Sequence, residues 1–522
     1  MLPEKINYTG TFEVKSGSNL SNIKNLAGQT VWYGASSIAA RFLNYLLTPY
    51  LTATLSGPGY GEMSLVYAAI PFLNVIFTYG IETAYFRFSR QESDKGDIYS
   101  TASISIFSST LLLTALLLLS GNQVADWLKL GEHPEFISYS AIIIALDTLS
   151  TLPFARLRQL GKPKKFAFIR LMGILITIAL TYFFISVCPK ILAANPGSFI
   201  SNFYKKDYGV GYVIIANMIA SACTLLLLYK ELFSFTWKFN VKTWKQMMVY
   251  SLPLIIAGLG GMINETFDRI MLNWWAPVSS AEAAKNEVGI YSACYKLSIL
   301  ISLFIQAFRM GAEPFFFKQA DGNNPQRTYA RVMKFFVITI TLMFLVVALY
   351  LDIWKYFIMN PDFWVGLKVV PVLLLANMFL GIYYNLSVWY KLTDKTLYGA
   401  WITLIGAAIT ILINYLFIPY FSYMACAWAT FFSYGCMMTV SFVWGQKHYR
   451  IPYAWKKLLA YMVIVVLLFF IHKGIISLFS NTYLNFTTAT LLILAYCWFI
   501  ALVEKKELPK LPVIGKYFTP AK

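Results

Sequence analysis

This sequence contains few histidines and no nucleotide-binding glycine motif. Both features argue against metal-dependent catalysis and ATP hydrolysis. The 522 residues include three histidines, and His133, His448 and His472 are too scattered to form a metal-ligand spacing. The chain contains no GxxxxGK[ST] loop, so nothing indicates that it hydrolyses ATP on its own. We therefore expect no metal, no cofactor and no catalytic residues.

Paired cysteines and an early apolar segment are also missing. No CxxC pair occurs, and the six cysteines are typical of small buried apolar residues rather than of disulfides or metal ligands. The first 25 residues are polar, so we expect no cleavable signal peptide. The first spanning helix would then act as its own insertion signal.

Charged residues make up only 13% of the chain, whereas soluble domains carry about 25%. Hydrophobic residues make up 58%, and long apolar runs occur at residues 111–120, 171–187 and 461–471. This composition predicts an all-α integral membrane protein with about fourteen transmembrane helices. The predicted spans centre near Ala39, Leu73, Leu111, Ile144, Ile178, Ser221, Leu259, Leu300, Leu342, Met378, Gly406, Phe432, Leu467 and Ile493.

The net charge of +19 follows from where lysine and arginine occur. One set of alternate connections, with both termini, holds about 30 of them, and the other set holds about 8. The positive-inside rule therefore predicts that both termini are cytoplasmic. Basic residues near anionic lipid headgroups account for the charge, so we expect membrane lipids and no nucleic acid as partners.

An internal repeat relates the two halves of the chain. Five residues recur at an offset of about 228 positions: Arg41, Pro49, Gly61, Ser64 and Tyr67 fall on Arg269, Pro277, Gly289, Ser292 and Tyr295. Six helices per repeat return the chain to the same side, so the halves are parallel and related by an axis along the membrane normal. This is a transporter layout, with the cargo held in a central cavity between the halves.

The repeat suggests a division of the chain. Residues 1–25 would form a cytoplasmic N-tail, 26–232 the first six-helix bundle and 246–446 the second. Residues 457–503 would add two further transmembrane helices, and 504–522 a cytoplasmic C-tail. No extramembrane segment is long enough to bury a core of its own.

Ionisable residues inside apolar segments are the candidates for function, because charge at membrane depth is costly. The most concentrated group lies at residues 260–275. The cations are Arg41, Arg170, Arg269, Lys296 and Arg309, and the carboxylates are Glu82, Asp147, Glu265, Asp268 and Glu313.

Two interpretations of these ionisable residues remain open. Glu265 with Arg269, and Arg309 with Glu313, are four residues apart and would neutralise each other on a helix. Alternatively, these groups line a hydrated cavity for a polar cargo. Asp147 has no basic neighbour in its helix, so it is either a protonatable coupling site or a residue that packs helices together.

The sequence as a whole resembles the polysaccharide-flippase branch of the multidrug/oligosaccharidyl-lipid/polysaccharide exporter superfamily. The likeness rests on the layout and on two segments, LAGQTVWYGASSIAARFLNYLLTPYLT and YGEMSLVYAAIPFLNVIFTYGIETAYFRFSR. It implies flipping of a polyprenyl-pyrophosphate-linked oligosaccharide across the bacterial inner membrane, for surface polysaccharide and lipopolysaccharide biosynthesis. The two halves would rock to give alternating access, and other polysaccharide-assembly proteins would be partners. Without an ATP-binding motif, the energy would come from a gradient of H+ or Na+, from the membrane potential or from downstream consumption of the cargo.

When the sequence is matched by position to this family, the resemblance implies four substrate-binding cations: Arg41, Arg269, Lys296 and Arg309. Asp147, Glu265, Asp268, Glu82 and Glu313 become coupling or cavity carboxylates. Two alternatives within the superfamily stay open, an ion-coupled multidrug exporter and a lipid II flippase. A polysaccharide polymerase or ligase is disfavoured, because such an enzyme would need a sizeable outer loop with catalytic residues.

Overall fold

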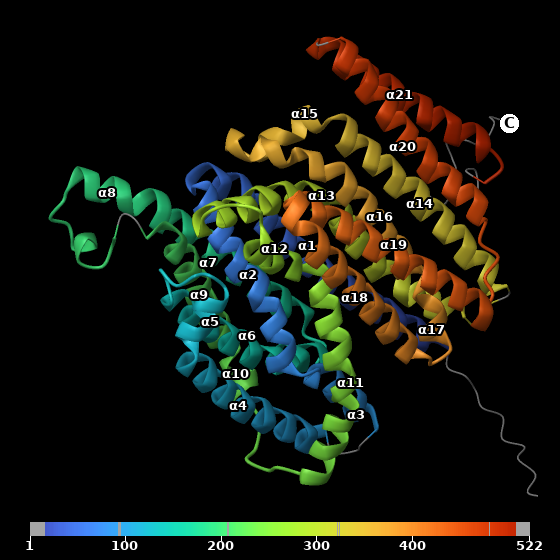
Figure 1. Ribbon diagram of the computed structural model, residues 1–522. Coiled ribbons are helices and arrows are strands. Elements are labelled where there is room, and N and C mark those ends of the chain that lie inside the picture. Colours follow the sequence, from blue (N-terminus) through green and yellow to red (C-terminus); the bar gives the residue numbers. More distant parts are fainter. Residues whose placement is uncertain are drawn as a thin grey trace, which may run out of the picture.

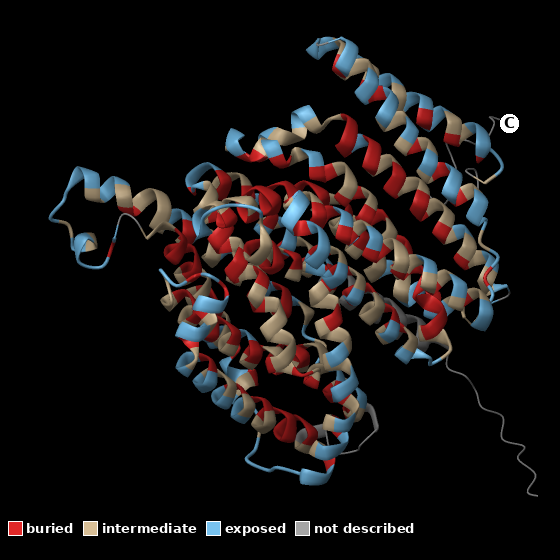
Figure 2. Cartoon of the chain, viewed as in Figure 1, coloured by how far each residue is buried: buried red, intermediate tan, exposed pale blue. Residues whose placement is uncertain are grey.

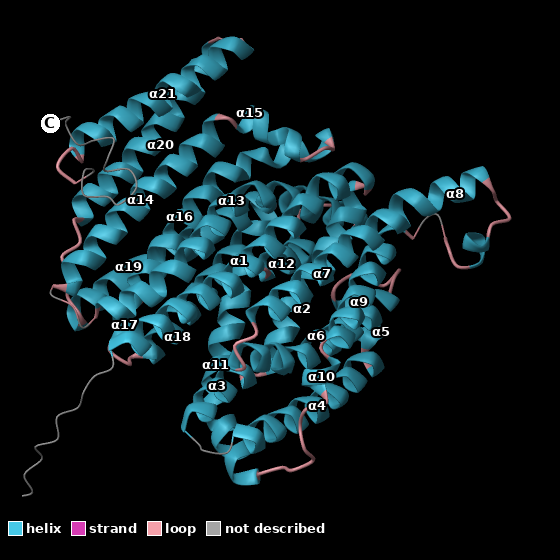
Figure 3. Ribbon diagram, turned by 180° about the vertical axis from the view of Figure 1, so that it is seen from behind, coloured by secondary structure: helices cyan, strands magenta, loops and turns pink. Residues whose placement is uncertain are grey.

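The computed structural model describes residues 16–91, 95–205, 208–320, 322, 324–479 and 481–507. Within these residues all regular structure is helical (Figure 3). Most of the predicted N-tail and C-tail lies outside the described residues. Among the described residues, thirteen helices are long and apolar enough to cross a membrane. They coincide with thirteen of the predicted spans, and the remaining span, centred on Ala39, falls on α1, so the chain is a multi-pass membrane protein.

The first half of the chain, residues 16–232, forms one bundle, coloured blue to green in Figure 1. Its helices are α1 (Ser16–Thr54), α2 (Gly57–Thr78), α3 (Ile81–Gln91), α4 (Lys95–Leu119), α5 (Gly121–Trp127), α6 (Glu135–Gln159), α7 (Pro163–Tyr182), the π-helix η1 (Phe183–Val187), α8 (Cys188–Ala194), the 3₁₀ helix η2 (Phe199–Asn202), α9 (Gly209–Leu227) and α10 (Tyr229–Leu232).

The second half, residues 241–448, forms a second bundle, and two further helices follow it. The second half contains α11 (Val241–Glu265), α12 (Phe267–Trp275), α13 (Ala281–Gln319), α14 (Pro325–Leu349), α15 (Leu351–Trp354), η3 (Lys355–Phe357), η4 (Pro361–Val369), α16 (Val370–Leu386), α17 (Val388–Leu392), α18 (Thr396–Phe421) and α19 (Tyr423–His448). The last two helices are α20 (Trp455–Leu478) and α21 (Thr482–Val503).

Buried residues concentrate on the helices that face the centre of the molecule, such as α13, whereas few residues of α20 and α21 are buried (Figure 2). The exposed side chains of the outer helices are largely apolar, for example Leu111, Leu467 and Leu494. In a membrane these side chains contact acyl chains. The polar groups that remain inside the protein are therefore the ones that need a structural or functional explanation.

The two halves meet most closely where α2 crosses α13. A methyl carbon added to Gly61 would overlap the backbone carbonyl of Lys285, and one added to Gly289 would overlap that of Gly57. Small residues allow such close approach of membrane helices. Gly61 and Gly289 are also equivalent positions in the repeat, as expected if its axis passes between these two helices.

A buried ion pair lies beside this crossing. The ammonium of Lys285 is 3.1 Å from the carboxylate of Glu62, and both residues are less than 10% exposed. The pair joins the first half to the second at the end of α2 that follows Thr54. Under the predicted topology this end faces the outside of the cell.

The C-terminal helices are fixed to α14 by a cluster around Glu504, which directly follows α21. The Glu504 carboxylate accepts hydrogen bonds from Lys334 at 2.8 Å and from Tyr461 at 2.6 Å, and it lies 2.6 Å from the ammonium of Lys457. Burial alone would raise the pKa of this carboxyl. The hydrogen bonds from Lys334, Lys457 and Tyr461 outweigh burial, so the pKa of Glu504 is lowered.

We expect a Glu504→Gln variant to lower the Tm of the detergent-solubilised protein by several degrees at pH 7. A hydrogen bond to a charged group contributes about 1.5–3 kcal/mol. Because the folded pKa is depressed, this stabilisation is complete above the unfolded carboxyl pKa of about 4.3 and is lost as the pH falls below it. The Tm difference between wild type and variant should therefore shrink between about pH 5 and pH 3. A pH-independent difference would contradict this assignment.

Candidate functional site

A cavity of about 1030 Å³ lies in the middle of the protein. Most of its lining comes from α1, α2, α6, α7 and α9 of the first half. The second half contributes Glu265, Thr266, Arg269, Ser292 and Lys296. Two pairs that the repeat makes equivalent, Arg41 with Arg269 and Ser64 with Ser292, face this same cavity. The predicted central cavity is therefore present, and cations from both halves reach it.

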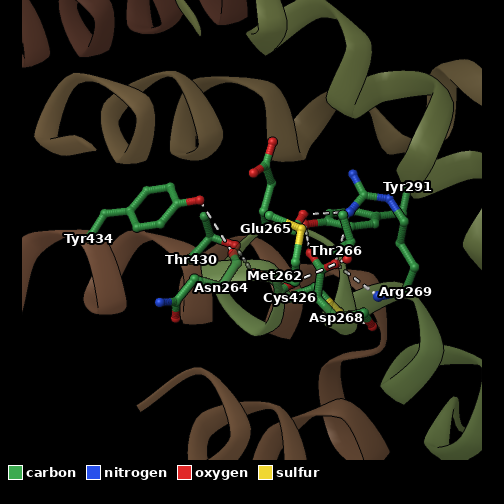
Figure 4. Close-up of polar contacts among 10 residues, drawn as sticks. All are labelled: Met262, Asn264, Glu265, Thr266, Asp268, Arg269, Tyr291, Cys426, Thr430 and Tyr434. Atoms are coloured by element: carbon green, nitrogen blue, oxygen red, sulfur yellow. Dashed lines mark hydrogen bonds and ion pairs between the residues drawn. The ribbon is translucent and has the colours of Figure 1, made fainter. Parts of the chain in front are cut away.

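Arg269 is held in place by a break in its helix. Helix α11 ends at Glu265 and α12 begins at Phe267, because Thr266 leaves the helical conformation with φ −133° and ψ −19°. One guanidinium nitrogen of Arg269 donates to the freed backbone carbonyl of Glu265 at 2.9 Å (Figure 4). The same nitrogen donates to the Asp268 carboxylate at 3.0 Å.

This geometry corrects the expected pairing of Glu265 with Arg269. The ion-pair partner of Arg269 is Asp268, and only the backbone of Glu265 contacts the guanidinium. The spacing of four residues assumed one continuous helix, and the break at Thr266 removes that condition. The Glu265 carboxylate forms no ion pair with Arg269. It lines the cavity as an exposed acidic group.

Two tyrosines complete the support of Arg269. The Tyr291 hydroxyl donates to the second oxygen of Asp268 at 2.6 Å, and Asp268 itself is only 2% exposed. The guanidinium carbon of Arg269 lies 4.5 Å from the centre of the Tyr295 ring. Asp268 does not line the cavity. It acts as a buried anion that fixes the cation in front of it.

Arg41 and Lys296 carry charge that no acidic side chain neutralises by direct contact in the described part of the chain. Arg41 donates to the neutral Gln306 side chain at 2.7 Å, and it is exposed to the cavity. For Lys296, no hydrogen-bond or ion-pair partner is found among the described residues, although it lies within electrostatic range of Arg269. These two cations are therefore free to bind an anionic group of a cargo.

The remaining charges of the cavity face each other in the first half. Arg158 pairs with Glu82, and both side chains line the cavity. The guanidinium of Arg170 is within electrostatic range of Asp147, which is exposed to the cavity. Arg158 lies in the last turn of α6, so its position in the sequence does not distinguish it from the basic residues of the following connection. Only its contact with Glu82, 76 positions earlier in the chain, shows that it belongs to the cavity.

The structure brings six of the nine predicted site residues to the cavity and leaves three outside its lining. The six are Arg41, Glu82, Asp147, Glu265, Arg269 and Lys296. Asp268 is buried behind Arg269. Arg309 pairs with Glu313 at 3.3 Å, as the spacing predicted, and Glu313 also contacts Lys391 at 2.7 Å. Arg309 and Glu313 thus already have partners.

Comparison with known proteins agrees with this architecture. A family model described as polysaccharide biosynthesis protein matches residues 26–320, a range that includes every residue lining the cavity. An uncharacterized membrane protein of Haemophilus influenzae is 21% identical over 365 residues, which cover 69% of this chain and 81% of the relative.

Solved structures of transporters share the fold. The chain superposes on the lipid II flippase MurJ in an inward closed conformation with a TM-score of 0.69 and 14% identity, covering 91% of this chain and 99% of that one. It superposes on an inward-facing multidrug resistance MATE transporter of the MOP superfamily with a TM-score of 0.60 and 13% identity, covering 78% and 94%. At these identities the likeness shows the fold alone, and it confirms the predicted all-helical membrane architecture.

Proposed function

Since this chain belongs to the polysaccharide biosynthesis protein family, whose model matches residues 26–320, we propose that it flips a polyprenyl-pyrophosphate-linked oligosaccharide across the bacterial inner membrane. The cargo would serve the synthesis of surface polysaccharide and lipopolysaccharide. One observation carries the proposal: Arg41, Arg269 and Lys296 come from both halves and face one cavity between helices long enough to span a membrane. A pyrophosphate is the part of such a lipid that requires cations at this depth.

The side chains suit that headgroup. Arginine presents a planar fork of donors that matches phosphate oxygens, and lysine adds a compact charge. Arg41 and Arg269 belong to different halves, so a rocking motion changes their separation while both remain bound to the cargo. The polyprenyl tail would stay in the lipid outside the protein while the two halves move relative to each other.

Coupling to H+ or Na+ belongs to the same proposal. Asp147 and Glu265 are carboxylates exposed to the cavity without an ion pair at contact distance among the described residues. Either group could take up a cation as the cavity changes its access, with both termini of the chain remaining cytoplasmic.

A multidrug exporter is the second candidate, and the same two carboxylates favour it because they would bind organic cations. The fold is common to both functions, since the chain resembles a lipid II flippase and a MATE transporter. A lipid II flippase would use the cavity cations in the same way as an oligosaccharide flippase. The nature of the cargo therefore has to be tested directly.

We expect Arg41→Gln and Lys296→Gln each to slow lipid flipping about 10- to 100-fold, the effect of losing one charge-assisted contact to the cargo. Neither change leaves a buried carboxylate without its cation, so folding should be retained. The measurement is translocation of a polyprenyl-pyrophosphate oligosaccharide between the leaflets of proteoliposomes.

The matched control is Lys318→Gln, which removes an exposed lysine from the same helix as Lys296 without touching the cavity. It should flip the lipid at the wild-type rate. Wild-type flipping by both cavity variants would remove the proposed headgroup role. Transport of organic cations in place of the lipid would identify an exporter, and transport of lipid II alone would identify a lipid II flippase.

A further inference from the structure

The two halves contribute different chemistry to the cavity. The first half supplies a wall of neutral hydrogen-bonding side chains from five helices. Examples are Asn44 on α1, Tyr67 and Asn74 on α2, Thr151 on α6, Thr177 on α7 and Asn217 on α9. The neutral polar side chains of the second half that line the cavity are Thr266 and Ser292. This asymmetry cannot follow from the repeat, which predicts similar walls on both sides.

Much of the hydrogen-bonding capacity of this wall is unused within the protein. Asn44 has no partner among the described residues and is exposed to the cavity. The side-chain oxygen of Asn74 is buried without a partner. Thr151 and Thr177 donate to carbonyls of their own helices, which leaves the hydroxyl oxygens able to accept. Unpaired polar groups are costly inside a membrane protein, so this wall is built for water or for a polar ligand.

Charged side chains of the first half also line this wall. Apart from Arg41, which we assign to the pyrophosphate headgroup of the cargo, their charges balance. Arg158 pairs with Glu82, and Arg170 faces Asp147. A ligand that rests against the wall therefore meets a surface with both donors and acceptors but little net charge. Arg41 on α1 and Lys296 on α13 line the same cavity without an acidic partner at contact distance among the described residues, so they remain available for an anion.

We propose that the first-half wall is a sugar-binding surface for glycans without net charge, and that the cations Arg41, Arg269 and Lys296 hold only the pyrophosphate. This inference rests on the proposed function and deepens it. Hydroxyl and amide groups match a sugar ring, because each side presents donors and acceptors. An acidic sugar chain would bring charge that the paired residues of the wall do not neutralise, and such a mismatch discriminates against it.

The experiment compares three lipids in proteoliposomes: polyprenyl pyrophosphate carrying a single sugar, a neutral oligosaccharide, or an oligosaccharide of the same length with uronic acids. The variants are Asn44→Leu/Asn217→Leu and Thr177→Val. The matched control is Thr439→Val, an exposed threonine of α19 that also donates to the carbonyl four residues earlier. Size-exclusion profiles and Tm values report whether each variant folds.

We expect the double asparagine variant to slow the neutral oligosaccharide lipid at least 10-fold while the single-sugar lipid changes less than twofold. Thr177→Val should show the same selectivity at about threefold, and Thr439→Val no change. In contrast, Lys296→Gln should slow both neutral lipids equally. The wild-type protein should move the acidic oligosaccharide lipid at least 10-fold more slowly than the neutral oligosaccharide lipid.

Equal slowing of the single-sugar and oligosaccharide lipids, or equal wild-type rates for neutral and acidic glycans, would overturn the sugar-binding wall and leave the proposed function intact. If the asparagine variant does not fold, the wild-type comparison of neutral and acidic lipids still decides. A wild type that moves none of the three lipids would refute the proposed function, and this inference with it.

Discussion

A Gly61→Leu variant is expected to lose transport and to unfold at a clearly lower temperature than wild type. The first carbon of any side chain at this position would overlap the backbone carbonyl of Lys285, and backbone cannot move aside as a flexible side chain can. Overpacking typically costs about 1–3 kcal/mol or more, and here it would separate α2 from α13 where the halves meet. The measurements are Tm in detergent and lipid flipping in proteoliposomes.

The matched control is Gly474→Leu on α20, where an added side chain has nothing within 4 Å. This variant should keep the wild-type Tm and flipping rate, because the new leucine extends into space that lipid occupies. If Gly61→Leu behaved like Gly474→Leu, the crossing of α2 and α13 could not be the closest contact between the halves.

An Arg269→Ala variant is the second change with a large expected effect, and it should lower both stability and transport. The substitution leaves Asp268, which is 2% exposed, without its cation. Breaking a buried ion pair in this way costs about 3–5 kcal/mol. Transport should become undetectable, because the cargo also loses one of its three cavity cations.

A double variant separates these two roles. In Arg269→Ala/Asp268→Asn the uncompensated charge is gone and the asparagine can still accept from Tyr291, so most of the Tm should return while flipping stays absent. Recovery of flipping together with the Tm would show that Arg269 serves the fold alone. Arg309→Ala is the comparison for a sequence-predicted cation outside the cavity lining, and we expect it to flip lipid at close to the wild-type rate.

The order of the helices and much of the cavity could be predicted from the sequence, because both depend on patterns that repeat along the chain. Apolar length located the spans, and the offset of 228 positions aligned Gly61 with Gly289 and Arg41 with Arg269. Those residues do face each other or a common cavity. A sequence repeat predicts such contacts because equivalent residues of the two halves lie around the same axis.

The finer arrangement of charges could not be predicted, because it depends on local breaks and on distant contacts. The helix break at Thr266 transfers the ion pair of Arg269 from Glu265 to Asp268, and nothing in the residue spacing signals that break. Arg158 looks like one of many loop cations until the fold brings it to Glu82. A contact between residues 76 positions apart cannot be recognised from the periodicity of the sequence.

The buried ion pair between Glu62 and Lys285 affects how easily α2 and α13 can separate. Removing two ions from water costs nearly as much as their attraction returns, so such a pair adds little net stability. Separation of α2 from α13 would give both ions back their hydration shells. The ion pair therefore selects which surfaces meet by their charge, and it adds little to the free energy that separation of α2 from α13 would require.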